Sequence, residues 1–129
     1  MKILIISQYF WPENFRINEL TEDLVKLGHE LTVLTGYPNY PNGEIYKEYK
    51  KNKSQYSHYK GARIIRVPIL PRKKNKLNLI LNYISFLVNS IFLGYFKLRK
   101  HNFDVIFTCQ LSPVTIGITS AFFSKIKNC

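Results

Sequence analysis

The chain has 129 residues, of which 46% are hydrophobic, and its formal net charge is +11 from nineteen Lys and Arg against eight Asp and Glu. This length allows one domain with a moderate core. Cys109 and Cys129 share no metal-ligand spacing with the three histidines. We therefore exclude a disulfide framework and a zinc centre, and expect two reduced thiols and no metal site.

The chain opens with a short apolar run, residues 2–7, which is almost entirely aliphatic. Such a run is typical of a central parallel strand covered on both faces. It is too short for the apolar core of a secretory signal, so a cytoplasmic location is expected. A second strand is predicted over residues 30–35.

A helix is predicted between these two strands. Its apolar residues recur at spacings of three and four and should form one buried face: Ile17, Leu20, Leu24 and Leu27. Asn14 or Glu13 is expected to cap its start, and Gly28 occupies the position of a left-handed C-cap. His29 follows this cap at the amino end of the second strand, so we interpret it as structural and not as a catalytic base.

The middle of the chain is less regular. Residues 36–60 are rich in Tyr, Lys, Asn and Pro and show no periodicity, which predicts a long loop of the kind that forms lids or binding loops. A third strand is predicted over residues 62–67, ending at Pro68, and a fourth over residues 104–109. A last helix should cover residues 114–127.

Residues 77–96 contain no charged residue and are long enough to cross a membrane. Polar side chains nevertheless recur at intervals of four, three and four: Asn78, Asn82, Ser85 and Asn89. Such a stripe is unfavourable against lipid tails. It favours a helix that packs on a sheet or lies in a membrane interface over one that spans the membrane.

Basic residues bracket this apolar segment: Arg72, Lys73, Lys74, Lys76, Lys97, Arg99 and Lys100. Cations beside a membrane-seeking segment predict contact with an anionic lipid surface. The alternative is that they are solvated loop charges. No zinc finger, basic zipper or RNA-recognition signature is present, so a nucleic-acid partner is not expected.

The order of predicted elements indicates an α/β fold with a Rossmann-like, doubly wound parallel sheet. Ligands of open α/β sheets bind at the carboxyl ends of the strands. Three segments should therefore surround one crevice: residues 8–16, 36–43 and 109–113. The absence of Gly-x-Gly-x-x-Gly after the first strand disfavours a dinucleotide oxidoreductase.

Two stretches carry a family resemblance: Ser7-Gln8-Tyr9-Phe10-Trp11-Pro12-Glu13-Asn14-Phe15-Arg16, and Leu27 to Gly36 followed by Tyr37-Pro38-Asn39-Tyr40-Pro41. With Ser112-Pro113-Val114-Thr115-Ile116-Gly117, they closely resemble the N-terminal domain of family-four glycosyltransferases of the GT-B fold. The chain is most similar to the subgroup that builds bacterial surface polysaccharides, which includes fucosamine transferases of O-antigen synthesis and colanic acid transferases.

The resemblance implies retaining transfer of a sugar from a nucleotide-sugar donor to a lipid-linked acceptor at the inner face of the cell membrane, without another cofactor. It implies that residues 1–129 are part of the acceptor-binding domain. The domain that binds the nucleotide sugar, with its paired glutamates, would lie beyond Cys129. We therefore expect the 129-residue chain to be inactive alone. A non-catalytic remnant that binds a membrane surface or a partner is the alternative.

Several residues are candidates for binding the acceptor or donor. Arg16 would pair with a phosphate and Glu13 and Asn14 would hydrogen-bond sugar hydroxyls, unless they only cap the helix. Tyr9 and Trp11 would stack on a sugar or fill the loop's own core. By resemblance, the remaining candidates are Tyr37, Asn39, Gln110 and Ser112. Gln110 is the candidate for the catalytic position, where many relatives have a histidine next to the fourth strand and this chain has Cys109-Gln110.

Overall fold

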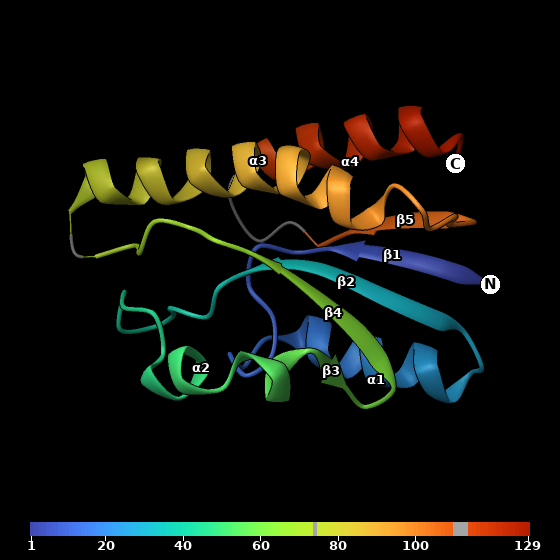
Figure 1. Ribbon diagram of the computed structural model, residues 1–129, viewed down its shortest axis with the longest axis horizontal. Helices are drawn as coiled ribbons and strands as arrows, with labels where there is room; N and C mark the ends of the chain where they lie inside the picture. Colours follow the sequence, from blue (N-terminus) through green and yellow to red (C-terminus); the bar gives the residue numbers. More distant parts are fainter. Residues whose placement is uncertain (74, 110–113) are drawn as a thin grey trace.

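The computed structural model of the chain describes residues 1–73, 75–109 and 114–129. Within them one sheet has the strand order β3-β4-β2-β1-β5. Its parallel strands are β1 (Lys2–Ile6), β2 (Glu30–Gly36), β4 (Ala62–Val67) and β5 (Val105–Thr108), and β3 (His58–Tyr59) pairs antiparallel with β4. Helices α3 (Lys76–Leu98) and α4 (Thr115–Lys127) cover one face, and α1 (Arg16–Lys26) lies on the other (Figure 1). The predicted α/β fold is confirmed.

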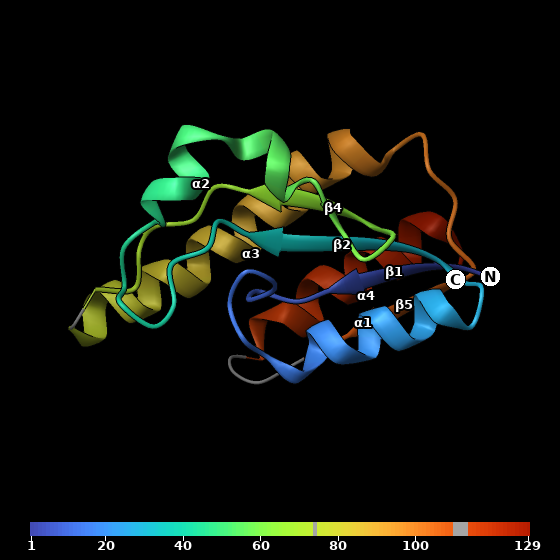
Figure 2. The same cartoon turned by 90° about the horizontal axis from the view of Figure 1, so that it is seen from below.

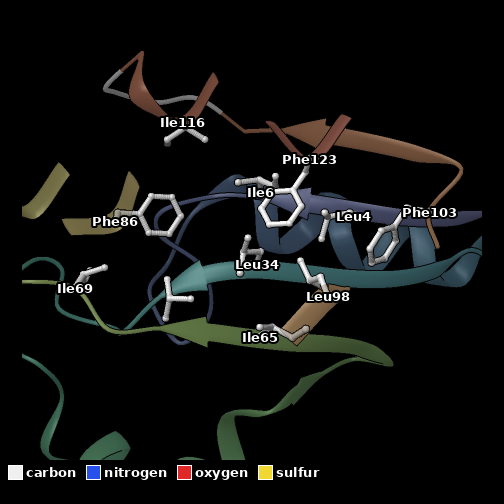
Figure 3. Close-up of a cluster of buried hydrophobic side chains, with 11 residues drawn as sticks. Leu4, Ile6, Leu34, Ile65, Ile69, Phe86, Leu98, Phe103, Ile116 and Phe123 are labelled. Carbon is white, nitrogen blue, oxygen red and sulfur yellow. The ribbon is translucent and has the colours of Figure 1, made fainter. Parts of the chain in front are cut away.

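The sheet separates two apolar layers, because successive residues of a strand face opposite sides. Leu4 and Ile6 of β1 point toward α3 and α4, where they meet Phe86 and Phe123 (Figure 3). The alternate residues Ile3 and Ile5 belong to the layer on the side of α1. Four aliphatic residues in succession are thus all buried, as expected for a central strand.

Helix α1 ends as predicted and begins differently. Gly28 has a φ of +84°, its N–H donates to the carbonyl of Val25, and the N–H of His29 donates to that of Leu24. This pair of hydrogen bonds is the Schellman arrangement. At the start of the helix the N-cap is Phe15, with no side-chain cap hydrogen bond. The prediction that Asn14 or Glu13 caps α1 was therefore wrong.

The predicted buried face of α1 was also partly wrong. Ile17 is buried, but Leu27 is 73% exposed and Leu20 is exposed as well. The helix instead turns Thr21 inward, and the Thr21 hydroxyl is satisfied by donating to the carbonyl of Ile17 at 2.7 Å. A hydroxyl that bonds its own helix backbone can be buried without an outside partner.

Residues 36–60 contain more regular structure than predicted. They include the short helix α2 (Lys47–Lys51), the 3-10 turn η1 (Lys53–Tyr56) and strand β3. Aromatic packing orders this segment: Tyr49 is 3% exposed, and its ring lies 5.0 Å from that of Tyr37 and 5.5 Å from that of Tyr56. The antiparallel β3 makes the sheet mixed, where the sequence indicated only parallel strands.

Helix α3 turns its polar stripe toward the protein. The side-chain amide of Asn82 donates to the carbonyl of Leu70 at 2.6 Å, and that of Asn89 donates to the carbonyl of Pro68 at 2.7 Å. The hydroxyl of Ser85 accepts the N–H of Leu70 at 2.9 Å. These three side chains thus hydrogen-bond the backbone of the segment that follows β4, as a neighbouring strand would do in a sheet.

Two further contacts fix α3 against its neighbours. Gly94 is buried, and a Cβ there would lie 3.1 Å from Leu34 and 3.2 Å from Phe123, so the absence of a side chain permits the close approach. The ammonium group of Lys127 donates to the carbonyls of Leu98 at 2.8 Å and His101 at 2.6 Å. It thereby binds the Leu98 carbonyl at the end of α3, which lacks a partner within the helix, and the His101 carbonyl in the segment that follows.

Candidate functional site

The carboxyl ends of β1, β2 and β4 point to one edge of the molecule, where the loop between β1 and α1 lies (Figure 2). The N–H of Ser7 donates to the carbonyl of Leu34 at 3.1 Å, and the N–H of Gly36 donates to that of Gln8 at 3.2 Å. The start of the loop after β1 is therefore hydrogen-bonded to the last residues of β2. Two of the three predicted crevice segments meet here.

Glu13 connects these two loops through a buried carboxylate. Its Oε1 accepts the N–H groups of Asn39 at 2.8 Å and Tyr40 at 2.7 Å, and its Oε2 accepts that of Phe10 at 3.2 Å. Burial raises the pKa of Glu13 from 4.5 to about 6, although these three hydrogen bonds oppose the shift. Both oxygens are occupied, so the geometry assigns Glu13 to positioning the loops.

Arg66 forms a second connection below the loops. Its guanidinium donates to the carbonyl of Gly36 at 3.0 Å and to the carbonyl of Trp11, and it lies 5.6 Å from the ring centre of Tyr49. Burial lowers the pKa of Arg66 to about 10, which leaves the group charged at neutral pH. A planar guanidinium with several donors is suited to joining two carbonyls, here one at the end of β2 and one in the loop after β1.

A third buried contact joins the β1 loop to α3. The side-chain amide of Gln8 donates to Oδ1 of Asn82 at 2.6 Å, and the hydroxyl of Tyr9 donates to the same oxygen at 3.3 Å. Oε1 of Gln8 is buried and finds no hydrogen-bond partner among the described residues. A buried acceptor without a partner is unusual in a folded protein, and this one lies beside the carboxyl ends of the strands.

The aromatic candidates of the β1 loop pack mainly on one another. Tyr9 is 7% exposed, and its ring lies 5.4 Å from that of Phe15 and 5.8 Å from that of Tyr40. Burial raises the pKa of the Tyr9 hydroxyl to about 12. Trp11 is half-buried between the rings of Tyr56 and Tyr59, at 5.2 and 5.3 Å. Of the two rings, that of Trp11 is the more exposed and is therefore the better placed to stack on a ligand.

The remaining candidate site residues differ in how far they are buried. Asn14 and Arg16 are exposed beside the start of α1. Asn39 is fully buried, and its side-chain amide donates to the carbonyl of Tyr37 at 3.0 Å. The ring of Tyr37 is half-buried and lies 5.1 Å from the ammonium of Lys53. Gln110 and Ser112 lie outside the described residues, and so does Lys74 among the predicted basic contacts.

Three residues that organise this edge were not among the predicted site residues. Asn18 accepts the N–H of Trp11 at 3.0 Å and donates to the carbonyl of Glu13 at 2.7 Å, bracing the β1 loop from within α1. Arg66 and Asn82 are the other two. Arg66 interrupts an aliphatic strand and Asn82 belongs to the polar stripe, and both irregularities were visible in the sequence. No pattern marked Asn18.

The described residues contain no group of three or more His, Cys, Asp or Glu side chains that could hold a metal ion. Comparison with known proteins adds no identity: no protein-family model matches the chain, no curated protein matches it, and no solved structure matches it.

Proposed function

We propose that this chain is the acceptor-binding part of a retaining glycosyltransferase that uses a nucleotide-sugar donor. The observation that carries the proposal is the contact between Glu13 and the N–H groups of Asn39 and Tyr40. It joins, at the ligand edge of the sheet, the two segments on which the family resemblance depends. The β1 loop holds aromatic and polar side chains in the position where a dinucleotide-binding fold has glycines.

The proposed acceptor is a saccharide linked through a diphosphate to a membrane lipid. Arg16, exposed at the rim, would pair with a phosphate oxygen through its guanidinium. Asn14, exposed beside it, would hydrogen-bond a sugar hydroxyl. Glu13 and Asn39 would hold the loops that present them. Such an acceptor places the reaction at the cytoplasmic face of the cell membrane.

In the proposed reaction the acceptor oxygen forms a bond to the anomeric carbon of the donor sugar, on the face from which the nucleoside diphosphate departs. The bond from that carbon to the phosphate oxygen breaks, and the acceptor's proton passes to the departing phosphate. This route needs no histidine at Cys109-Gln110. By the resemblance, the groups that hold the donor belong to a second domain. The 129-residue chain alone should therefore yield no product from a nucleotide sugar, and measurable transfer by it would refute that division of labour.

Binding of the acceptor tests the proposal directly. We would titrate the chain with a short-chain, water-soluble polyprenyl diphosphate monosaccharide and, separately, with a nucleotide sugar. The lipid-linked sugar should bind more tightly. Arg16→Ala should weaken its binding about tenfold or more, the loss expected for a charge-assisted hydrogen bond.

Lys26→Ala supplies the matched control, because Lys26 is an exposed cation in the last turn of the same helix, where it pairs with Glu22 at 3.1 Å. It should bind the acceptor as the parent chain does. Tighter binding of the nucleotide sugar, no binding of the acceptor, or equal losses in both variants would each count against an acceptor site at this edge. The alternative, a non-catalytic remnant, predicts binding of neither compound.

A further inference from the structure

Helix α3 is oriented with its apolar side away from the protein. Its buried positions follow one another at intervals of four: Asn82, Phe86, Ser90, Gly94 and Leu98. A residue two positions further along lies about 200° around the helix axis. The corresponding opposite row is Ile84, Val88, Phe92 and Phe96, and all four are exposed, Phe92 to 66%. Hydrophobic side chains thus form the outer row of the helix, while polar side chains share the inner one.

The outer surface of α3 is larger than a scattering of single apolar residues. Leu77, Ile80 and Leu81 extend the row toward the start of the helix, each exposed. Toward its end, Ile91, Phe92, Tyr95 and Phe96 enclose with Phe122 of α4 a depression of about 350 Å³ with a wholly apolar lining. A continuous apolar surface of this kind on a folded protein marks a contact with a partner or a membrane. We call the row Leu77, Ile80, Leu81, Ile84, Val88, Phe92 and Phe96 the outer face of α3.

Cations stand at both ends of the outer face. Lys73 and Lys76 are exposed at its start, and Arg99 and Lys100 are exposed just after its end. Lys97, which the sequence also suggested, is directed inward, because its ammonium donates to the carbonyl of Arg66 at 2.8 Å. The sequence has no Asp or Glu between Glu48 and Asp104. The complementary surface must therefore supply negative charge beside an apolar layer.

We propose that the outer face of α3 lies in the interface of an anionic lipid bilayer, with the helix axis parallel to the membrane plane. Acyl chains would contact the apolar row, and lipid phosphates would contact the basic residues at each end. A second copy of this chain is a poor occupant, because a symmetric pairing along the length of α3 brings the basic ends of the two helices together, and the helix has no carboxylate to offset them. This inference does not depend on sugar transfer.

The helix also has the length and composition of a membrane span. Two observations favour the parallel orientation instead. The inner side of α3 packs on β2, β4 and α4, and Asn82, Ser85 and Asn89 are engaged with the segment after β4. Only 22% of its most apolar stretch is buried, which also distinguishes α3 from the core helix of a soluble protein.

Vesicle flotation with the full 129-residue chain tests the proposal. The chain should float with vesicles of phosphatidylcholine containing about 30 mol% phosphatidylglycerol, and much less with phosphatidylcholine alone. Raising the salt from about 0.1 M to about 1 M should weaken binding, because exposed charges are then screened. Equal binding to both vesicle types, or no binding to either, would overturn the proposal.

Variants locate the contact. Phe92→Ser should lower the vesicle partition coefficient about ten- to a hundredfold, whereas Leu27→Ser, at an equally exposed leucine on the opposite side of the sheet, should not change it. Replacing Lys76, Arg99 and Lys100 by Gln should weaken binding roughly fivefold per residue. Gln at Lys50 and Lys51 of α2, which lies on the α1 side of the sheet (Figure 1), and at Lys60 in the turn between β3 and β4 should have little effect. Circular dichroism verifies that each variant is folded.

Two outcomes would name a different occupant or orientation. A dimer in sedimentation velocity that Phe92→Ser dissociates, without vesicle binding, would assign the outer face to a second copy. For depth, single tryptophans at Ile84, Val88 and Phe92 in a Trp11→Phe background can be quenched by lipids brominated at different carbons. A helix parallel to the membrane places all three at similar depth. A spanning helix would spread them over about 12 Å.

Discussion

Oε1 of Glu13 lies 2.8 Å from the backbone nitrogen of Asn39, although the two residues belong to loops after different strands. The carboxylate accepts backbone N–H groups from both loops, that of Phe10 after β1 and those of Asn39 and Tyr40 after β2. Its role is to hold two loop backbones at a fixed separation, and this role leads to the first two predictions.

Glu13→Ala should destabilise the fold by about 2–4 kcal/mol, because three buried N–H groups lose their acceptor and a cavity is left. Urea denaturation monitored by circular dichroism measures the loss. Glu19→Ala, an exposed carboxylate in the first turn of α1, is the comparison and should change stability by less than about 1 kcal/mol. Similar losses in the two variants would show that Glu13 does not hold the loops.

Stability should also depend on pH through Glu13. Its pKa is raised by burial from 4.5 to about 6, so between these values the folded state binds more protons than the unfolded state. The contribution is therefore fully present below pH 4.5 and is lost as the pH rises to about 6, by about 2 kcal/mol in total. Denaturation at several pH values should reveal this slope in the parent chain. If Glu13→Gln retains the same slope, another group is responsible.

Asn82→Leu should destabilise the chain by about 1–3 kcal/mol. It leaves the amide of Gln8 and the carbonyl of Leu70 without their buried partner. Asn78→Leu is the matched control, because Asn78 belongs to the same polar stripe one turn earlier in α3. The side chain of Asn78 makes no hydrogen bond among those found in the described residues. This variant should alter the free energy of unfolding by less than about 0.5 kcal/mol. Equal effects in thermal denaturation would contradict the assigned hydrogen bonds.

Gly94→Val should be more damaging than Gly117→Val. A Cβ at Gly94 already approaches Leu34 and Phe123 closely, and the two methyl groups of valine would push α3 away from the sheet, at about 1–3 kcal/mol. A Cβ at Gly117 in α4 meets nothing within 4 Å, so valine there should be neutral or stabilising, given the low helix propensity of glycine. Thermal melts of both variants make the comparison, and the reverse order would argue against close packing at Gly94.

The strands were predictable because continuous aliphatic runs have few alternative structures. Residues 2–7 and 62–67 became β1 and β4 almost unchanged. The buried side of α1 was not predictable from apolar spacing, because Asn18 and Thr21 are buried, whereas Leu20 and Leu27, which the spacing assigned to that side, are exposed. Each satisfies its polar atoms against nearby backbone. The spacing of apolar residues does not identify buried polar residues whose side chains hydrogen-bond the nearby backbone.

The same limit applied to α3 and to the site. Periodicity identified the polar stripe of α3 without indicating that it faces inward, which depends on the carbonyls of Pro68 and Leu70. Two of the three segments predicted to meet at the sheet edge, residues 8–16 and 36–43, do so, and residues 110–113 of the third lie outside the described residues. The role of Glu13 in holding the loops was not predicted, because it depends on N–H groups in another loop. The roles of Arg16 and Asn14 stay predictions.

At the proposed ligand edge, the burial of Glu13 and Arg66 separates the residues that fix the shape of the loops from the residues that would select a ligand. Buried Glu13 and Arg66 hold the loop backbones, whereas Asn14 and Arg16 are exposed at the rim, and their side chains make no hydrogen bond among those found in the described residues. Substitutions at exposed positions of this kind typically change stability by less than about 0.5 kcal/mol. One or two substitutions at the rim could therefore change which ligand is bound, while the buried residues that hold the loops stay the same.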